Sequence, residues 1–165
     1  MKIEKHYLEE KLVCFNAFQN LNQIEKAIQL IKKQTDKKLQ LTVLGKINGV
    51  FIENEKNLNE KISKTKILWK NILSDSVDFG SFYTPEIGNV FVAGNLVSTF
   101  LHEINGKPLA VMTCGTYSVF RGIGANDKQA ISYLKKLNYG YYLLIIRGFD
   151  TDIRKLETII EYTYL

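Results

Sequence analysis

A continuous apolar run near the carboxyl end of the chain, Tyr141 to Ile146, is the feature that most restricts the fold. A strand that is buried on both faces has an unbroken apolar run, whereas a strand with one wet face alternates apolar and polar residues. The run therefore predicts a strand with a central position in a sheet. Gly140 stands before it as the expected stop of a helix, and Asp150 after it can cap a last helix.

Three further strands are predicted, at Leu12–Phe15, Leu39–Leu44 and Asn89–Ala93. Gly45 is expected to stop the second strand, and the third lies between Gly88 and Gly94. The helical spacing of apolar residues predicts helices at about 20–35, 58–73, 95–104, 108–120 and 126–138, and from residue 150 onward. The segment 74–87 has the composition of an irregular loop.

Without the segment that holds the second helix, this order is βαββαβ, which is the order of the ferredoxin-like split βαβ sheet. A chain of 165 residues is long enough for one domain with a full hydrophobic core. We therefore predict a single α+β domain over residues 1–165, with a ferredoxin-like sheet, helical insertions and a C-terminal helix. In the helix near residue 126, the residues expected to face inward are Ala130, Ile131, Leu134 and Leu137.

The positive charge of the chain is nearly all lysine. Lys and Arg number 22 against 17 Asp and Glu, a formal net charge of +5, and the arginines are Arg121, Arg147 and Arg154. Proteins that read nucleic acid rely on arginine, because its planar fork matches phosphate and guanine edges. The lysines are scattered and mixed with glutamates, so they predict solvated faces and no specific nucleic-acid partner.

The sequence favours a cytoplasmic location. The longest uncharged stretch, Ile87 to Leu101, is too short for a membrane span, and Met1 to His6 lacks the apolar core of a signal peptide. Cys14 and Cys114 are isolated, which indicates two reduced thiols.

The strand-to-helix turn at Gly94 is the candidate ligand site. Free N–H groups at the N-terminus of a helix attract a phosphate or a carboxylate. The candidate residues for a small anionic ligand are Gly88, Gly94, Asn95 and Lys46. The turn lacks the glycine spacing and the Lys-Ser/Thr pair of a P-loop. The alternative interpretation is that the glycines only let the strand turn tightly into a helix.

No catalytic group of residues is visible in the sequence. Ser98 and His102 are four apart and would share a helix face, but a hydrolase also needs an orienting acid and a nucleophile on an exposed turn. The other histidine is His6, and no cluster has metal-ligand spacing. Tyr139 to Ile145 lacks the basic residue and the alternating aromatics of an RNA-recognition motif. We expect no catalysis, no cofactor and no metal.

Four segments carry a resemblance to a known family: Val13–Ile31, Leu41–Lys46, Pro85–Leu96 and Gly122–Gly148. Together and in this order they resemble the small bacterial general stress proteins of the heat-induced stress protein family. The resemblance implies a stress-linked context, and it supplies no catalytic residues. Many relatives have strongly apolar segments where this chain has charges such as Lys66, Asp75 and Glu103, which speaks against a membrane role.

The leading expectation is a non-enzymatic, stress-associated protein that binds a partner or a small ligand. The first alternative is an anion- or nucleotide-binding module that uses the Gly88–Asn95 turn. The second is weak nucleic-acid binding or peripheral membrane binding. The tyrosine-rich, apolar last strand and helix favour a homodimer.

Overall fold

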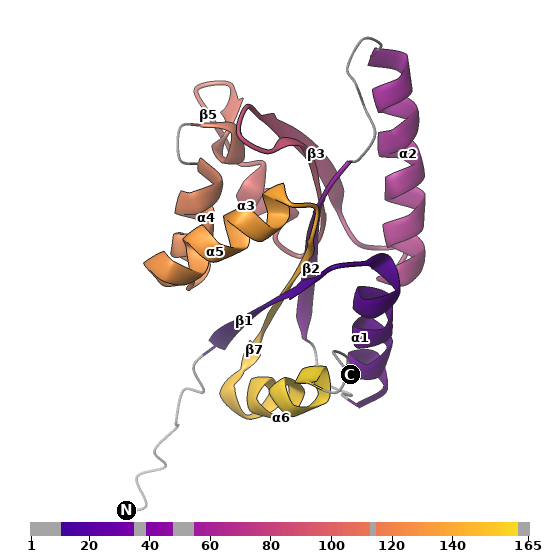
Figure 1. The fold of residues 1–165 in the computed structure, drawn as a ribbon, viewed down its shortest axis with the longest axis vertical. Coiled ribbons are helices and arrows are strands. Elements are labelled where there is room, and N and C mark those ends of the chain that lie inside the picture. The colour runs from indigo at the N-terminus through magenta and orange to yellow at the C-terminus, as the bar shows by residue number, and fades with distance from the viewer. Residues whose placement is uncertain (1–10, 35–38, 48–54, 113–114, 162–165) are drawn as a thin grey trace, which may run out of the picture.

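The structure is a computed structural model, and it describes residues 11–34, 39–47, 55–112 and 115–161. These residues form a mixed α+β fold in three layers, with one five-stranded antiparallel sheet between two groups of helices (Figure 1). His6 and Cys114 lie outside the described residues. None of the helices in the described segments is long and apolar enough to cross a membrane.

The elements follow one another in an order that mixes strands and helices throughout. The strands of the large sheet are β1 (Lys11–Phe18), β2 (Gln40–Lys46), β3 (Phe79–Thr84), β4 (Gly88–Gly94) and β7 (Tyr142–Phe149). A small hairpin consists of β5 (Glu103–Ile104) and β6 (Lys107–Pro108). The helices are α1 (Leu21–Gln34), α2 (Glu55–Ile72), α3 (Val97–Phe100), the 3-10 helix η1 (Leu109–Val111), α4 (Gly115–Ile123), α5 (Asp127–Asn138) and α6 (Asp150–Glu161).

The strand β7 lies inside the sheet, whose order is β1-β7-β2-β4-β3. It pairs with β1 along its whole length, from Tyr142 to Phe149, and with β2 on its other side, from Leu143 to Arg147. The central position predicted from the apolar run is therefore confirmed.

The α+β class is confirmed, whereas a ferredoxin-like arrangement is not. In a ferredoxin-like sheet the first strand lies inside the sheet and the last strand at an edge, but here β1 is at the edge and β7 is inside. The strands β1 and β2 are parallel to each other with β7 between them, and β4 and β7 are parallel with β2 between them. Two split βαβ connections are thus present, in a different strand order.

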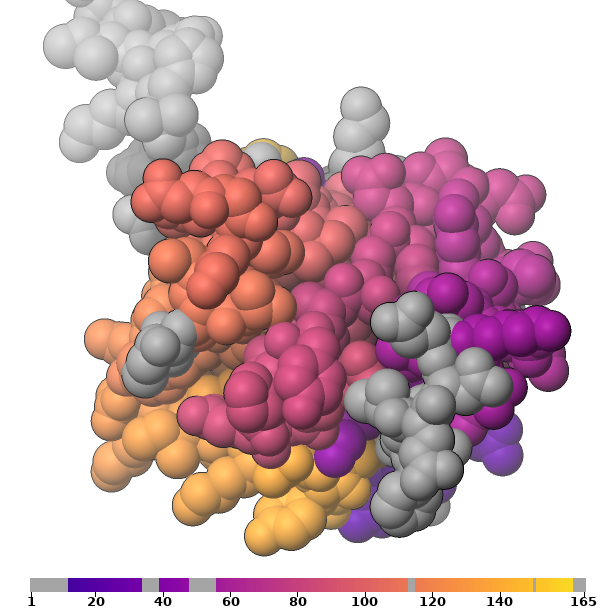
Figure 2. Space-filling view, turned by 90° about the horizontal axis from the view of Figure 1, so that it is seen from above, coloured from indigo at the N-terminus to yellow at the C-terminus, as the bar shows by residue number. Residues whose placement is uncertain are grey.

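Each face of the sheet has its own hydrophobic core. On one face α1, α2 and α6 pack over Val43, Phe91 and Leu144, and on the other face α3, α4 and α5 pack over Val92 and Ile145. Successive residues of a strand point to opposite faces, so an interior strand between two helical layers needs apolar residues at every position. Seen from above, the β3–β4 segment fills the middle of the surface, between α2 and the helices of the other layer (Figure 2).

Gly45 lies inside β2 and does not stop it, so this prediction is wrong. The strand continues to Lys46 because Gly45 leaves room for a cluster of aromatic rings. A Cβ atom at Gly45 would lie 2.6 Å from Cε1 of Phe91 and 2.9 Å from Cδ1 of Tyr142. The ring of Trp69 packs against both, with centroid distances of 5.4 Å to Phe91 and 5.7 Å to Tyr142.

The structure corrects three further predictions between residues 74 and 120. The segment 74–87, expected to be irregular, contains the edge strand β3. The helix expected over 95–104 is only the single turn α3, and Ile104 belongs to β5. The helix expected over 108–120 is divided: η1 covers Leu109–Val111, and α4 begins at Gly115. A Cβ atom there would lie 2.0 Å from the carbonyl oxygen of Leu109, so only glycine fits.

The helix starts predicted near residues 20 and 126 are confirmed, and each has a side-chain cap. The side-chain oxygen of Asn20 accepts a hydrogen bond from the N–H of Gln23 at 3.0 Å, and Asn126 forms a reciprocal capping box with Gln129. Gly140 ends α5 with a φ of 90°, as expected of a glycine stop. Of the four residues expected to face inward on α5, Ile131 is instead exposed to solvent.

Replacing Gly45 by alanine should lower the free energy of unfolding by about 1–3 kcal/mol. The new methyl group would collide with the ring of Phe91, which is 2% exposed and stacked between Trp69 and Phe79, so it has no space to move. Urea denaturation followed by the fluorescence of the single tryptophan measures the loss. Gly122→Ala in α4 is the matched control: its Cβ meets nothing within 4 Å, so stability should hold or rise slightly. Wild-type stability in Gly45→Ala would contradict the close packing.

Candidate functional site

The backbone N–H groups of the turn at Gly94 are bonded inside the protein. The N–H of Gly94 donates to the carbonyl of Asp78 at 2.9 Å, and that of Asn95 donates to the carbonyl of Leu41 at 3.2 Å. The next N–H along the chain donates to the buried hydroxyl of Thr42 at 3.0 Å. An anion at this turn would have to displace these acceptors.

Gly94 itself is pressed against the neighbouring strand. Its φ is +122°, and a Cβ atom would lie 2.1 Å from the carbonyl oxygen of Leu41. The helix that follows, α3, has four residues and so offers little helix dipole. This geometry favours the interpretation that the glycine lets β4 turn closely over β2.

The four candidate residues lie in two places. Gly94 and Asn95 are at one end of β4, and Gly88 is at the other end, about 20 Å away at the usual rise of a strand. Lys46 lies at the Gly88 end of β2, and its Nζ donates to the carbonyl of Asn138 at 3.1 Å. A cation at this position stabilises the C-terminus of α5 by offsetting its dipole. The structure therefore does not bring the four residues together.

Asn95 lines a small cavity of about 260 Å³ between β2 and the C-terminal ends of α1 and α2. The walls of this cavity are mostly apolar, and its cation is Lys32. The ammonium of Lys32 donates to the carbonyls of Ile72, at 2.8 Å, and Leu73 at the end of α2. The charge of this lysine thus holds the end of α2 in place.

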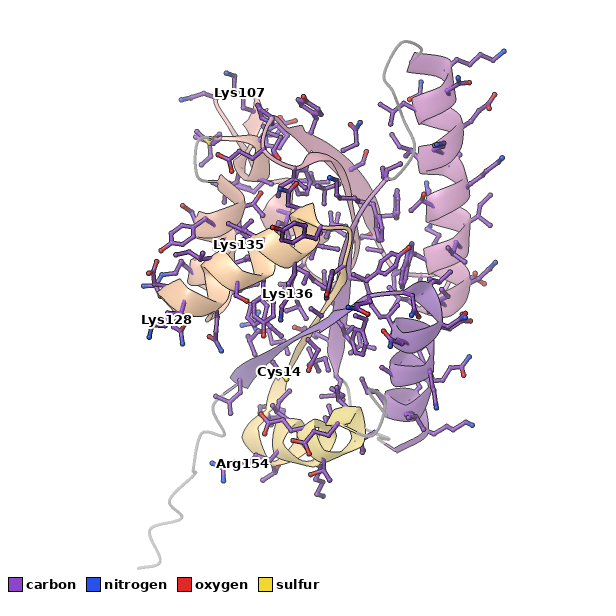
Figure 3. The ribbon with its side chains drawn as sticks, viewed as in Figure 1. Cys14, Lys107, Lys128, Lys135, Lys136 and Arg154 are labelled. Carbon is purple, nitrogen blue, oxygen red and sulfur yellow. The ribbon has the colours of Figure 1, made fainter. Side chains whose placement is uncertain are left out.

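A larger and more polar groove lies where the end of β1, the segment leading into α1 and the C-terminal half of α5 meet, and we call it the β1–α5 groove. Its volume is about 610 Å³. Its lining residues are Phe15, Asn16, Ala17, Gln19, Gln23, Tyr133, Lys136 and Tyr141. Figure 3 shows Lys136 on α5 and Cys14 on the neighbouring strand β1.

Tyr133 fastens α5 to β1 at one side of the groove. Its hydroxyl donates to the carbonyl of Phe15 at 2.9 Å, and its ring stacks on the ring of Phe15 with a centroid distance of 5.1 Å. Burial raises the pKa of Tyr133, and nearby Cys14 raises it further. The hydroxyl therefore stays a donor at neutral pH. The ammonium of Lys136 lies 5.6 Å from the centre of the same ring, within the range of a cation–π contact.

The other side of the groove consists of amide and hydroxyl groups. The side-chain amide of Gln19 donates to the hydroxyl oxygen of Tyr141 at 2.8 Å, and the backbone N–H of Gln19 donates to the side-chain oxygen of Gln23 at 3.2 Å. Because the Tyr141 oxygen accepts this bond, its O–H can donate to a ligand. These hydrogen bonds also hold the side chains of Gln23 and Tyr141 in one geometry, which lowers the entropy cost of binding a ligand.

Cys14 lies beside the groove in an unreactive form. Burial raises the pKa of its thiol, and the carboxylate of Glu157 also raises it, whereas a hydrogen bond from the side-chain amide of Asn16, at 3.2 Å, acts in the opposite direction. A thiol with a raised pKa is mostly protonated at neutral pH and is a poor nucleophile.

The groove has a cationic character. Lys136 carries the one formal charge among its lining residues, and none of them is a carboxylate. An ammonium group together with amide N–H and phenol O–H donors is suited to a phosphate or a carboxylate, because charge-assisted hydrogen bonds to such groups are strong. In the segments that the structure describes, no group of three His, Cys, Asp or Glu side chains is arranged to hold a metal ion.

The sequence did not single out this groove, because its residues come from 15–23 and 133–141 and meet only in the folded chain. The Ser98 and His102 pair does not form on one helix, since α3 ends at Phe100 and both side chains are exposed.

Comparison with family models, with curated proteins and with solved structures finds no significant match to the chain. The resemblance to the general stress proteins therefore stays a prediction. The function has to be inferred from the groove and the surface of the protein itself.

Replacing Tyr133 by phenylalanine should lower the free energy of unfolding by about 0.5–1.5 kcal/mol at neutral pH, because the bond to the Phe15 carbonyl is lost. The cost should shrink at alkaline pH. The pKa of Tyr133 is raised in the folded protein above its value of about 10 in the unfolded chain. Its contribution is therefore complete below about pH 10 and is lost as the pH rises through the folded pKa.

Urea denaturation at neutral pH and at several pH values above about 10 measures this cost. Tyr139→Phe is the control, because the exposed Tyr139 should show no cost at any pH. A cost for Tyr133→Phe that stays constant over the whole range would contradict the raised pKa.

Proposed function

We propose that the protein is a non-enzymatic binding protein that takes a small anionic molecule in the β1–α5 groove. The observation that carries this proposal is the groove itself. Its volume of about 610 Å³ is within the range of small-molecule sites, and Lys136 is its single charge among hydrogen-bonding side chains. The anionic ligand that the sequence assigned to the Gly94 turn is thus proposed for a different place.

The donors of the groove support an oxygen-rich anion as the ligand. Lys136 can donate three N–H bonds, Tyr141 one O–H, and the amide of Gln23 two N–H bonds. They come from α5, from the residue just before β7 and from α1, so a ligand that carries one phosphate or two carboxylates could accept from three parts of the chain at once. Such a ligand would also hold these elements together.

The ionisable groups in and beside the groove support binding over catalysis. The hydroxyl of Tyr133 is engaged with the backbone of β1, and the pKa values of Tyr133 and Cys14 are both raised. A base or a nucleophile needs the deprotonated form near neutral pH, and burial disfavours that form in both residues.

The family resemblance supports the stress-linked context of this function, and the isolated cysteines support the cytoplasmic location. For the homodimer, the support comes from the sheet: β1 and β3 are edge strands in the described part of the chain. The apolar residues of β7 and α6 that suggested a dimer, such as Ile145 and Leu156, are buried in the protein's own core.

A homodimer predicts a mass of twice 19.0 kDa when the purified protein is measured by size-exclusion chromatography with light scattering. The measurement is made over a concentration series, because a weak dimer dissociates on dilution. A mass of 19.0 kDa at every concentration contradicts the dimer and leaves the groove unaffected.

Ligand binding predicts that a phosphorylated or carboxylated metabolite raises the melting temperature of the protein. A panel of inorganic phosphate, citrate, sugar phosphates and nucleoside monophosphates is suitable. At a concentration about 100-fold above Kd, binding adds about 2.7 kcal/mol of stability. For a chain of this size, that corresponds to a rise of about 5–10 °C.

Lys136→Gln should abolish the rise, whereas Lys107→Gln should keep it, because Lys107 lies in the small hairpin away from the groove (Figure 3). Both variants remove one positive charge, so a general charge effect would change them equally. A panel without any rise, or a rise that Lys136→Gln preserves, would refute the proposed site.

A further inference from the structure

The outer face of α5 combines lysines with exposed aromatic and apolar side chains. A shallow hollow of about 440 Å³ on this face is lined by Lys128, Ile131, Ser132, Lys135, Lys136 and Tyr139. Tyr139 is 81% exposed, more than any other large apolar or aromatic side chain of the described residues, and Ile131 is 43% exposed. We call these six residues the α5 outer face.

The spacing of these residues along the helix explains why they form one surface. Ile131, Lys135 and Tyr139 follow one another at intervals of four and so lie in one row, and Lys128, Ser132 and Lys136 form the adjacent row. At 1.5 Å per residue the surface from Lys128 to Tyr139 is about 16 Å long. Figure 3 shows Lys128 near the start of α5, with Lys135 and Lys136 toward its other end.

The charge of this surface is positive along its length. The carboxylate on α5 belongs to Asp127, and it accepts a hydrogen bond from the hydroxyl of Tyr117 on α4. Lys46 adds a further cation beside the C-terminus of the helix, where its Nζ binds the carbonyl of Asn138, the residue before Tyr139. A partner of opposite charge is therefore the one that this surface attracts.

The exposed tyrosine distinguishes this surface from an ordinary solvated face of lysines. A single exposed apolar residue needs no explanation, but here an almost bare aromatic ring shares one hollow with three lysine side chains. Proteins that bind single strands without sequence preference combine cations for the phosphates with aromatic rings on which bases stack. An acidic peptide would use the lysines and leave the ring without a matching planar group.

We propose that the α5 outer face binds single-stranded nucleic acid without sequence preference. Lys128 and Lys135 contact successive phosphates, and one unpaired base stacks on Tyr139. A length of about 16 Å holds only a few nucleotides, so binding is weak and depends strongly on salt. This inference does not rest on the ligand proposed for the β1–α5 groove: Lys136 lines both surfaces, but Tyr139, Lys128 and Lys135 do not line that groove.

The first experiment compares two strands that differ only in their bases. Fluorescence anisotropy at low salt measures the binding of the full protein to an oligothymidylate and to an abasic strand of the same length. The wild type should bind the oligothymidylate at least about fivefold more tightly, which is the lower end of the effect of stacking one base. Tyr139→Ala should bind both strands equally.

The second experiment measures the contribution of the lysines. With the two phosphate contacts of Lys128 and Lys135, the logarithm of the binding constant should fall with the logarithm of salt concentration at a slope of about −1.4. The double variant Lys128→Gln, Lys135→Gln should reduce this slope by about 1.4. The control Lys64→Gln, Lys66→Gln removes two exposed charges from α2 and should leave the slope unchanged.

Three results would overturn the proposal. The first is the absence of binding to the oligothymidylate at low salt. The second is equal affinity of the wild type for the abasic strand or for a polyglutamate peptide, which would assign the surface to acidic partners in general. The third is an equal loss of affinity in the α2 and α5 variants. Circular dichroism and the melting temperature verify that each variant is folded, since all substituted side chains are exposed.

Discussion

The insertion of β7 between β1 and β2 is the interaction on which the rest of the structure depends. Leu143 and Ile145 point from β7 into one core, and Leu144 and Ile146 point into the other. This strand therefore contributes to the hydrophobic cores on both faces of the sheet. β1 has β7 as its sheet partner, and the two strands are separated by most of the chain. Closing so long a loop costs entropy, and that cost is recovered only when both cores form together. The N-terminal strand and helix are therefore tied to the C-terminal strand thermodynamically as well as in space.

The same insertion produces the β1–α5 groove. The register pairs Phe18 with Tyr142, so the residues just beyond this pair, Gln19 and Tyr141, meet and form their hydrogen bond at 2.8 Å. The helix α5 ends a few residues before β7, so it lies close to β1, the strand that pairs with β7. Tyr133 on α5 therefore reaches β1, where its hydroxyl donates to the carbonyl of Phe15. The groove is thus a consequence of strand register, and a shift of β1 by one residue would separate both of these contacts.

Local signals in the sequence were sufficient where a few neighbouring residues decide the structure. The apolar run of β7 and the helix starts near residues 20 and 126 are of this kind, and they were predicted correctly. Gly45 was misread because its role depends on the rings of Phe91 and Tyr142, which lie on other strands. The turn at Gly94 was a candidate anion site because it leads from a strand into a helix, yet its N–H donors are bonded to the carbonyls of Asp78 and Leu41 and to the hydroxyl of Thr42. No local pattern shows such long-range acceptors, and the strand order and the groove were missed for the same reason.

The net charge of +5 says little about function until the folded structure shows where the lysines lie. The lysines of α5 are dispersed along the sequence, but helical spacing brings them to one surface. Lys46 on β2 adds a further charge beside them, because its Nζ donates to the carbonyl of Asn138 at the end of the same helix. Lys136 lies between the two surfaces: it lines the groove and the α5 outer face, and its ammonium is 5.6 Å from the centre of the Tyr133 ring. A long amphipathic side chain can cover apolar surface with its stem while its charge lies elsewhere. Lys136 therefore belongs to both surfaces, and the residues that separate their functions are those on either side of it: Gln19 and Tyr141 for the groove, and Lys128, Lys135 and Tyr139 for the outer face.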